Sequence, residues 1–137
     1  MTNLEINNLT KNRVDKKFLQ RVAKSVFKSI KLRNIQELSV VIVGDAEIKN
    51  LNKKYRKKDR VTDVLAFDYG LPGGQGEIFI CLSQAKRQAK KLGHSLKKEL
   101  ATLLIHGILH LAGYRDNTKN NKERMNKMQE IIWRKVI

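Results

Sequence analysis

The chain has 137 residues, 41% of them hydrophobic, which fits one globular domain over 1–137 and excludes a disordered tail. It carries 29 Lys and Arg against 13 Asp and Glu, and the net charge of +16 favours polyanionic partners, above all nucleic acid. The single cysteine excludes an internal disulfide and favours a cytoplasmic location. We expect no signal peptide and no membrane association, because the longest apolar stretch, Leu100–Tyr114, contains two histidines and is too short to cross a bilayer.

Four elements are expected in the first part of the chain. Apolar residues alternate in strands and recur every three or four residues in amphipathic helices, while β-branched runs favour buried strands. Asp45 stands at the start of a helical pattern, so it is the expected N-cap. The expected elements are a strand carrying Leu4, Ile6 and Leu9, a helix over Val14–Ile30, a strand over Leu38–Val43 and a helix through Arg56.

Strands and helices also mix in the second part. The glycine-rich stretch Leu71–Gly76 predicts a loop, and Gly93 and Gly113 predict helix ends. The expected elements are strands over Val61–Phe67 and Glu77–Leu82, a helix over Ser83–Leu92, a helix capped by Ser95 and a helix over Lys119–Val136 that buries Met125, Met128, Ile131, Ile132 and Val136. The sequence thus predicts an α+β fold in which about four strands form a small mixed sheet packed by about five helices.

The chemistry is concentrated between His106 and Asp116. Residues four apart face the same side of a helix, so the imidazoles of His106 and His110 can reach one ion. Gly113 ends the helix, and Asp116 can then turn back as a third ligand. Three protein ligands with an open fourth position are typical of catalytic zinc, although imidazole also binds other divalent metals. The sequence therefore predicts a metal site on a helix and the turn after it.

Two other interpretations of this segment stay open. Two histidines on a mostly apolar helix could be core residues with satisfied hydrogen bonds. The spacing H-x3-H-x2-G-x2-D is also similar to the zinc motif of a class of metallopeptidases, in which Glu follows the first His as general base. Here Gly107 follows His106, which disfavours peptide hydrolysis.

Three ordered blocks resemble the YbeY family of bacterial metal-dependent endoribonucleases. The family pattern H-G-x-L-H-L-x-G-Y-D-H, followed by Met, matches the chain from His106, with Met125 at the corresponding offset. The other two blocks are similar to Tyr55-Arg56 with Thr62–Phe67, and to Gly76–Ile80 with Gly93-His94-Ser95. The chain departs from the pattern at four positions: Asp116 replaces the third His, Arg115 replaces Asp, Ala66 replaces Ser and Asp68 replaces Pro.

The resemblance implies a zinc site in a cleft and single-strand-directed cleavage of RNA. It implies maturation of the 3′ end of small-subunit ribosomal RNA and ribosome quality control as the setting, with the ribosome or ribosomal proteins as partners. His106 and His110 are implied to be catalytic as well as metal ligands, with Asp116 as the third ligand. Arg56, in the Tyr-Arg block, is implied to be catalytic, since an Arg near a metal can clamp a phosphate.

Other residues receive structural interpretations. His94 either lines the cleft or sits in a turn between helices, and the turn is favoured. Cys81 is expected to be a buried, inert thiol, Trp133 is expected in the core, and Tyr114 is left open. The basic run Lys53–Arg60 is expected to guide the phosphate backbone, and few aromatic residues are available to read bases.

The rival functions are a non-catalytic RNA- or ribosome-binding assembly factor with a structural metal, and a metallopeptidase. Substituting His110 distinguishes the first of these from a nuclease. In a nuclease, the substitution should remove bound metal and cleavage while leaving RNA binding largely intact.

Overall fold

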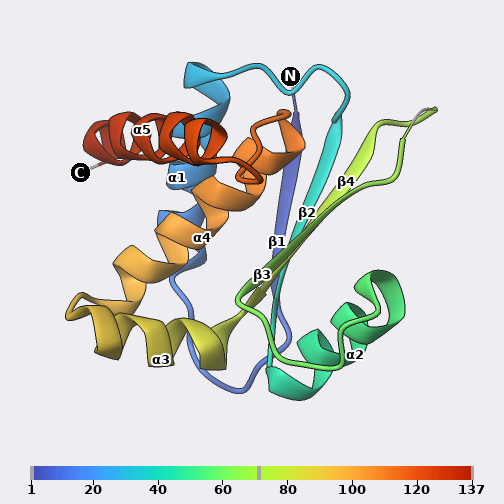
Figure 1. Ribbon diagram of the computed structural model, residues 1–137, viewed down its shortest axis with the longest axis vertical. Coiled ribbons are helices and arrows are strands. Elements are labelled where there is room, and N and C mark those ends of the chain that lie inside the picture. Colours follow the sequence, from blue (N-terminus) through green and yellow to red (C-terminus); the bar gives the residue numbers. More distant parts are fainter. Residues whose placement is uncertain (1, 71, 137) are drawn as a thin grey trace.

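A four-stranded mixed sheet runs through the centre of the molecule, in the order β1-β2-β4-β3 (Figure 1). The computed structural model describes residues 2–70 and 72–136. β1 pairs with β2 and β2 with β4 in parallel, whereas β3 pairs antiparallel with β4 and forms one edge. The strands are β1 Asn3–Asn8, β2 Glu37–Val43, β3 Val64–Asp68 and β4 Gln75–Cys81. The α+β fold expected from the sequence is confirmed.

Helices cover the two faces of the sheet unequally: α1, α3, α4 and α5 lie on one side and α2 alone lies on the other (Figure 1). The helices are α1 Lys16–Ser29, α2 Asp45–Arg56, α3 Leu82–Leu92, α4 Leu96–Leu111 and α5 Lys119–Val136. α4 occupies the centre of the larger layer, where it packs on β3 and β4 and on the three helices α1, α3 and α5. None of these five helices is long and apolar enough to cross a membrane.

The sheet buries apolar side chains on both faces, because its strands alternate between two hydrophobic clusters. Ile78 and Ile80 of β4 belong to the larger cluster under α1, α4 and α5, while Cys81 and Leu65 belong to a smaller one under α2. In β3, Val64 and Ala66 accordingly pack with the larger cluster, and Leu65 and Phe67 with the smaller. β3 therefore has one face toward the helix that carries the histidines and the other toward α2.

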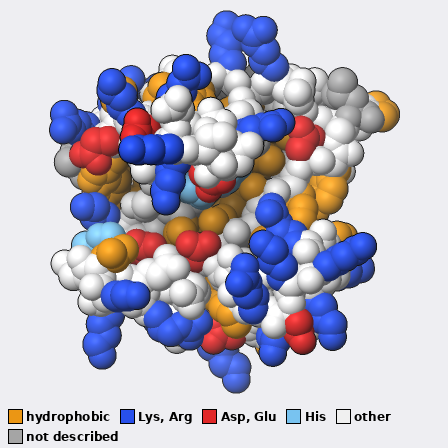
Figure 2. Space-filling model, viewed as in Figure 1, with side chains coloured by type: hydrophobic (Ala, Val, Ile, Leu, Met, Phe, Trp, Pro, Cys, Tyr) orange, Lys and Arg blue, Asp and Glu red, His pale blue; other side chains and the backbone are white. Residues whose placement is uncertain are grey.

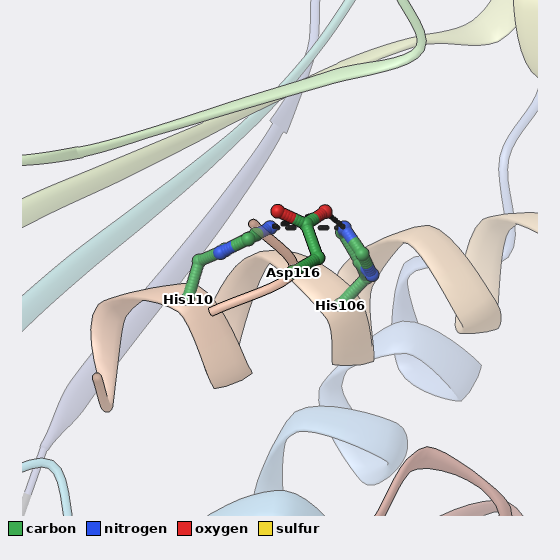
Figure 3. A group of neighbouring side chains, drawn as sticks. All are labelled: His106, His110 and Asp116. Atoms are coloured by element: carbon green, nitrogen blue, oxygen red, sulfur yellow. Dashed lines mark hydrogen bonds and ion pairs between the residues drawn. The ribbon is translucent and has the colours of Figure 1, made fainter. Parts of the chain in front are cut away.

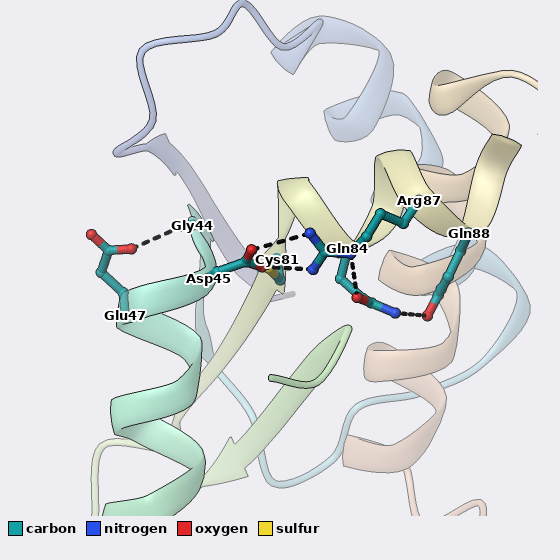
Figure 4. Close-up of polar contacts among 7 residues, drawn as sticks. All are labelled: Gly44, Asp45, Glu47, Cys81, Gln84, Arg87 and Gln88. Carbon is teal, nitrogen blue, oxygen red and sulfur yellow. Dashed lines mark hydrogen bonds and ion pairs between the residues drawn. The ribbon is translucent and has the colours of Figure 1, made fainter. Parts of the chain in front are cut away.

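An ion pair joins α2 to α3 (Figure 4). Arg87 donates two hydrogen bonds to the carboxylate of Asp45, at 2.7 and 3.1 Å, and the Cys81 thiol donates a third at 3.3 Å. Arg87 holds the pKa of Asp45 below its usual value, and burial raises the pKa of Cys81 to about 11. Cys81 is thus the buried thiol that the sequence predicted, and it stays protonated at neutral pH.

The helix caps differ from the prediction at α2. Gly44, not Asp45, is the N-cap, and the Glu47 carboxylate accepts a hydrogen bond from the Gly44 backbone N–H at 3.1 Å. Asp45 is the first helical residue, where its charge is available to Arg87 instead. The prediction failed because an acidic residue is favourable both as a cap and in the first turn.

Several predicted boundaries and burials are also corrected. Leu9 lies beyond the end of β1 and is 70% exposed, and Ile131 of α5 is 44% exposed. β3 begins at Val64 rather than Val61, and β4 begins at Gln75 rather than Glu77. Just before β4, the Gly74 carbonyl accepts hydrogen bonds from the backbone N–H groups of Gln36 and Glu37, at the start of β2. The predicted loop is a turn at residues 72–74; Leu71 lies outside the described residues.

Candidate metal centre

His106 and His110 lie one turn apart near the C-terminal end of α4, on the same face (Figure 3). Ser95 caps the helix by accepting from the Lys98 backbone N–H at 3.1 Å, as predicted. Gly113, with φ of 101°, follows the helix and turns the chain, which glycine does at no steric cost. The turn brings Asp116 back over the two imidazoles. The predicted arrangement of a helix and its following turn is therefore observed.

Three side-chain atoms of this group converge on one point. The Nε2 atoms of His106 and His110 are 3.0 Å apart, and Asp116 Oδ2 lies 3.8 and 3.7 Å from them. A triangle with these sides has its circumcentre about 2 Å from each corner, which is the length of Zn–N and Zn–O bonds. Among the described residues, no other His, Cys, Asp or Glu joins them to form such a group.

The other nitrogen of each imidazole is held by a separate partner. His106 Nδ1 lies 3.2 Å from Gln129 Oε1 of α5, and His110 Nδ1 lies 3.1 Å from the Tyr114 carbonyl. Both partners are acceptors, so each Nδ1 donates and each Nε2 presents a lone pair to the shared point. Histidines that bind metals are commonly oriented in this way. Two lone pairs and a carboxylate oxygen facing one another repel, and a cation between them removes the repulsion.

The surroundings of His110 favour its neutral form, which is the form that binds metal. Burial lowers the pKa of His110, and the charge of His106 lowers it further. Arg56, at the end of α2, is near enough to add to this effect, while Asp116 opposes it. The side chains of His106, His110 and Asp116 are 27%, 32% and 49% exposed, so the shared point is open to solvent. A metal held here would have room for a further ligand.

Gly107 explains how α4 comes so near the sheet. A Cβ at this position would lie 3.0 and 3.1 Å from Cγ2 and Cδ1 of Ile78, closer than ordinary contact. A glutamate here, as in the metallopeptidase motif, would be driven into β4. The structure therefore gives position 107 a packing role and leaves no space for the peptidase's general base.

The sequence missed two polar residues on or against α4: Gln129, which contacts the metal group, and Glu99, which lies outside it. Met125 anchors α5 in the core, and Gln129, one helical turn later, contacts His106. The spacing of one turn from Met125 was the only signal in the sequence that could have pointed to Gln129. Glu99 is 3% exposed and accepts hydrogen bonds from Gln88 at 2.7 Å and from His94 at 2.6 Å. His94 thus lies in the turn between α3 and α4, as favoured, and outside the metal group. Tyr114 and Trp133 are partly buried and pack against the larger cluster.

Positively charged side chains border a hollow in the surface of the molecule. Figure 2 shows histidine and acidic side chains inside a hollow crossed by an apolar strip, with Lys and Arg gathered over the α2 lobe beside it. Lys53, Lys54, Arg56, Lys57, Lys58 and Arg60 are all exposed at the end of α2 and just beyond. The predicted basic run is therefore a surface next to the candidate metal centre.

Known proteins are similar to this chain in sequence and in fold. A family model described as endoribonuclease YbeY matches residues 3–137. A curated endoribonuclease YbeY from Aquifex aeolicus is 44% identical over 84% of this chain and 78% of its own, and one from Phytoplasma australiense is 39% identical over 97% and 94%. A solution structure from Thermotoga maritima superposes with a TM-score of 0.64 at 32% identity, covering 97% of this chain and 91% of that one. The chain belongs to the YbeY endoribonuclease family.

Proposed function

We propose that this chain is a metal-dependent, single-strand-directed endoribonuclease that matures ribosomal RNA, with a zinc ion held by His106, His110 and Asp116. The observation that carries the proposal is the convergence of two imidazole lone pairs and one carboxylate oxygen on a point about 2 Å from each. Membership of an endoribonuclease family and a net charge of +16 support RNA as the substrate.

The donor set suits a catalytic cation better than a structural one. Structural zinc sites are closed by four protein ligands, whereas catalytic sites keep a position for water or substrate. A divalent cation in this group would supply a Lewis acid and would lower the pKa of its bound water to about 7. Asp116 adds a negative charge that a third imidazole would not add. The three ligands therefore also suit iron, nickel or manganese.

Each residue around the group has a defined role in this proposal. Gln129 and the Tyr114 carbonyl hold the Nδ1 hydrogens of the two histidines and so keep both Nε2 atoms directed at the shared point. Arg56 donates to a non-bridging oxygen of the scissile phosphate and stabilises the charge that grows there during cleavage. The lysines around Arg56 contact flanking phosphates, which gives affinity without sequence preference.

The setting of the reaction is part of the proposal. Membership of the YbeY family supports the 3′ end of small-subunit ribosomal RNA as the substrate, ribosome quality control as the wider role and the ribosome or its proteins as partners. The single, buried cysteine supports a reducing, cytoplasmic environment.

The experiment compares His110→Ala with His94→Gln, which changes the histidine outside the group and keeps a hydrogen-bond donor for Glu99. Purified proteins are analysed for bound metal, reloaded with zinc or manganese and incubated with a single-stranded RNA that carries the small-subunit 3′ end. His110→Ala should lose metal and cleavage but still bind RNA, with an affinity that falls steeply as salt rises. His94→Gln should keep metal and cleavage.

Three results would contradict the proposal. Cleavage that survives in His110→Ala would show that the group is not the catalytic centre. A wild-type protein that holds metal and binds RNA but cleaves with none of the metals would be an assembly factor instead. Hydrolysis of casein by the wild type would favour a peptidase.

A further inference from the structure

Half of the chain's aromatic residues, which are four Phe, three Tyr and one Trp, gather in one cluster at the β3 edge of the sheet. Phe67 of β3 is at its centre, with ring centroids 5.3 Å from Tyr55, 6.2 Å from Tyr69 and 6.0 Å from Phe79. Phe67 and Phe79 are half-buried against the smaller hydrophobic cluster. The packing therefore fixes the inner rings and presents the outer two.

The outer rings are unusually accessible for their type. Tyr55 is 53% exposed and Tyr69 is 55% exposed, whereas large aromatic side chains in a small domain are mostly buried. The Tyr69 ring is nearly parallel to Phe67, at 13°, and its hydroxyl donates to Glu77 at 2.8 Å, which fixes its orientation. Two exposed rings thus pack against Phe67, Tyr55 from the end of α2 and Tyr69 from just beyond the end of β3.

The cluster adjoins the candidate metal centre through α2 and β3. Tyr55 precedes Arg56, whose charge acts on the pKa of His110. Ala66, next to Phe67 in β3, packs on the opposite face with the cluster that α4 completes. An RNA strand that leaves the metal centre across the edge of β3 would therefore meet Arg56 first and the exposed rings next.

The charges around the aromatic cluster indicate what kind of ligand would bind there. Lys54 Nζ lies 5.2 Å from the centre of the Tyr55 ring, and Lys53, Lys57 and Lys58 are exposed nearby. At the other end, Glu5, Glu37 and Glu77 line a small hollow beside Tyr69 and would repel phosphates. Aromatic rings beside lysines bind single-stranded nucleic acid by stacking on bases, and the carboxylates limit the contact to a few nucleotides.

We infer that Tyr55 and Tyr69 form a stacking platform for unpaired bases of the RNA that flanks the scissile phosphate. Paired bases are already stacked and cannot present a face to these rings, so the platform selects single-stranded over duplex RNA. The inference rests on the proposed function for the identity of the ligand, and it adds the surface that makes the enzyme single-strand-directed.

The test measures binding without cleavage, so that it stays separate from the metal. A fluorescent ten-nucleotide 2′-O-methyl RNA, its duplex form and an abasic version are titrated by anisotropy in EDTA. Tyr55→Ala and Tyr69→Ala should each bind the single strand about tenfold more weakly, the usual effect of losing one base–aromatic stack. Tyr55→Phe and Tyr69→Phe keep the ring and should bind as the wild type does. Leu9→Ala removes a more exposed side chain just beyond β1, at the far edge of the sheet, and should leave RNA binding unchanged.

The probes separate stacking from a general loss of binding. The Tyr→Ala variants should bind the duplex and the abasic strand as the wild type does, with an unchanged salt slope and melting temperature. Equal affinity of wild type and Tyr→Ala variants for the single strand would overturn the inference, as would equal weakening for all three probes. A loss confined to the single strand supports the inference even if His110→Ala still cleaves RNA, so the two proposals fail independently.

Discussion

Replacing Gly107 by alanine tests how tightly α4 packs against β4 beside the metal centre. The added methyl would lie 3.0 Å from Ile78 Cγ2 and 3.1 Å from Cδ1, so helix and strand must separate by a few tenths of an ångström. Overpacking of this kind costs about 1–3 kcal/mol, and the better helix propensity of alanine offsets about 1 kcal/mol. We expect a net destabilisation of about 1 kcal/mol, which is about 3 °C in Tm for a domain of this size.

A double-mutant cycle isolates this contact. Ile78→Val alone removes Cδ1 and costs about 0.5–1.5 kcal/mol. Together with Gly107→Ala it should cost at least about 0.5 kcal/mol less than the two changes added, because it makes room for the methyl. Urea unfolding monitored by circular dichroism measures all four proteins. Gly107→Ala that is more stable than the wild type, or strictly additive changes, would refute this account of the contact.

Three further predictions concern the site and the α2–α3 ion pair. Gln129→Leu should weaken metal binding about 10–100-fold in chelator competition, because His106 loses the acceptor that orients its ring. Gln129→Glu keeps an acceptor and should restore the affinity for metal. A Gln129→Leu variant that binds metal as tightly as the wild type would contradict this role. Arg56→Ala should lower the cleavage rate while leaving metal content unchanged, and Arg56→Lys should not restore it, since lysine lacks the planar fork; a loss of metal would show another role. Asp45 has a lowered pKa in the folded protein, so the stability that it contributes is present above its unfolded pKa of about 3.9 and is lost as pH falls through the folded value. The difference in melting temperature between wild type and Asp45→Asn should therefore shrink as the pH is lowered below 4, and a constant difference would count against the ion pair.

Local spacing was enough to predict the core of the site. His106 and His110 face the same side because four residues make about one helical turn, and Gly113 signalled the reversal that returns Asp116. Such relations depend on a few consecutive residues, so they are readable before the fold is known.

Contacts between distant segments could not be read in the same way. Gln129 contacts His106 only because α5 packs on α4. Arg87 pairs with Asp45 only because α3 lies beside α2. The aromatic cluster joins a helix end, an edge strand and a central strand, so its members look unrelated along the chain. Ile131 and Leu9 fitted apolar patterns but are exposed, because a pattern shows which face is apolar without showing how much of it the fold covers.

The most direct test of the account is to locate the cation itself. Crystals of the zinc-loaded protein, measured on both sides of the zinc absorption edge, should show one anomalous peak about 2.0–2.2 Å from His106 Nε2, His110 Nε2 and Asp116 Oδ2, with at least one non-protein ligand completing the shell. A peak bound elsewhere, a shell closed by a fourth protein side chain, or two histidines that bind different ions would contradict a catalytic centre built on these three residues.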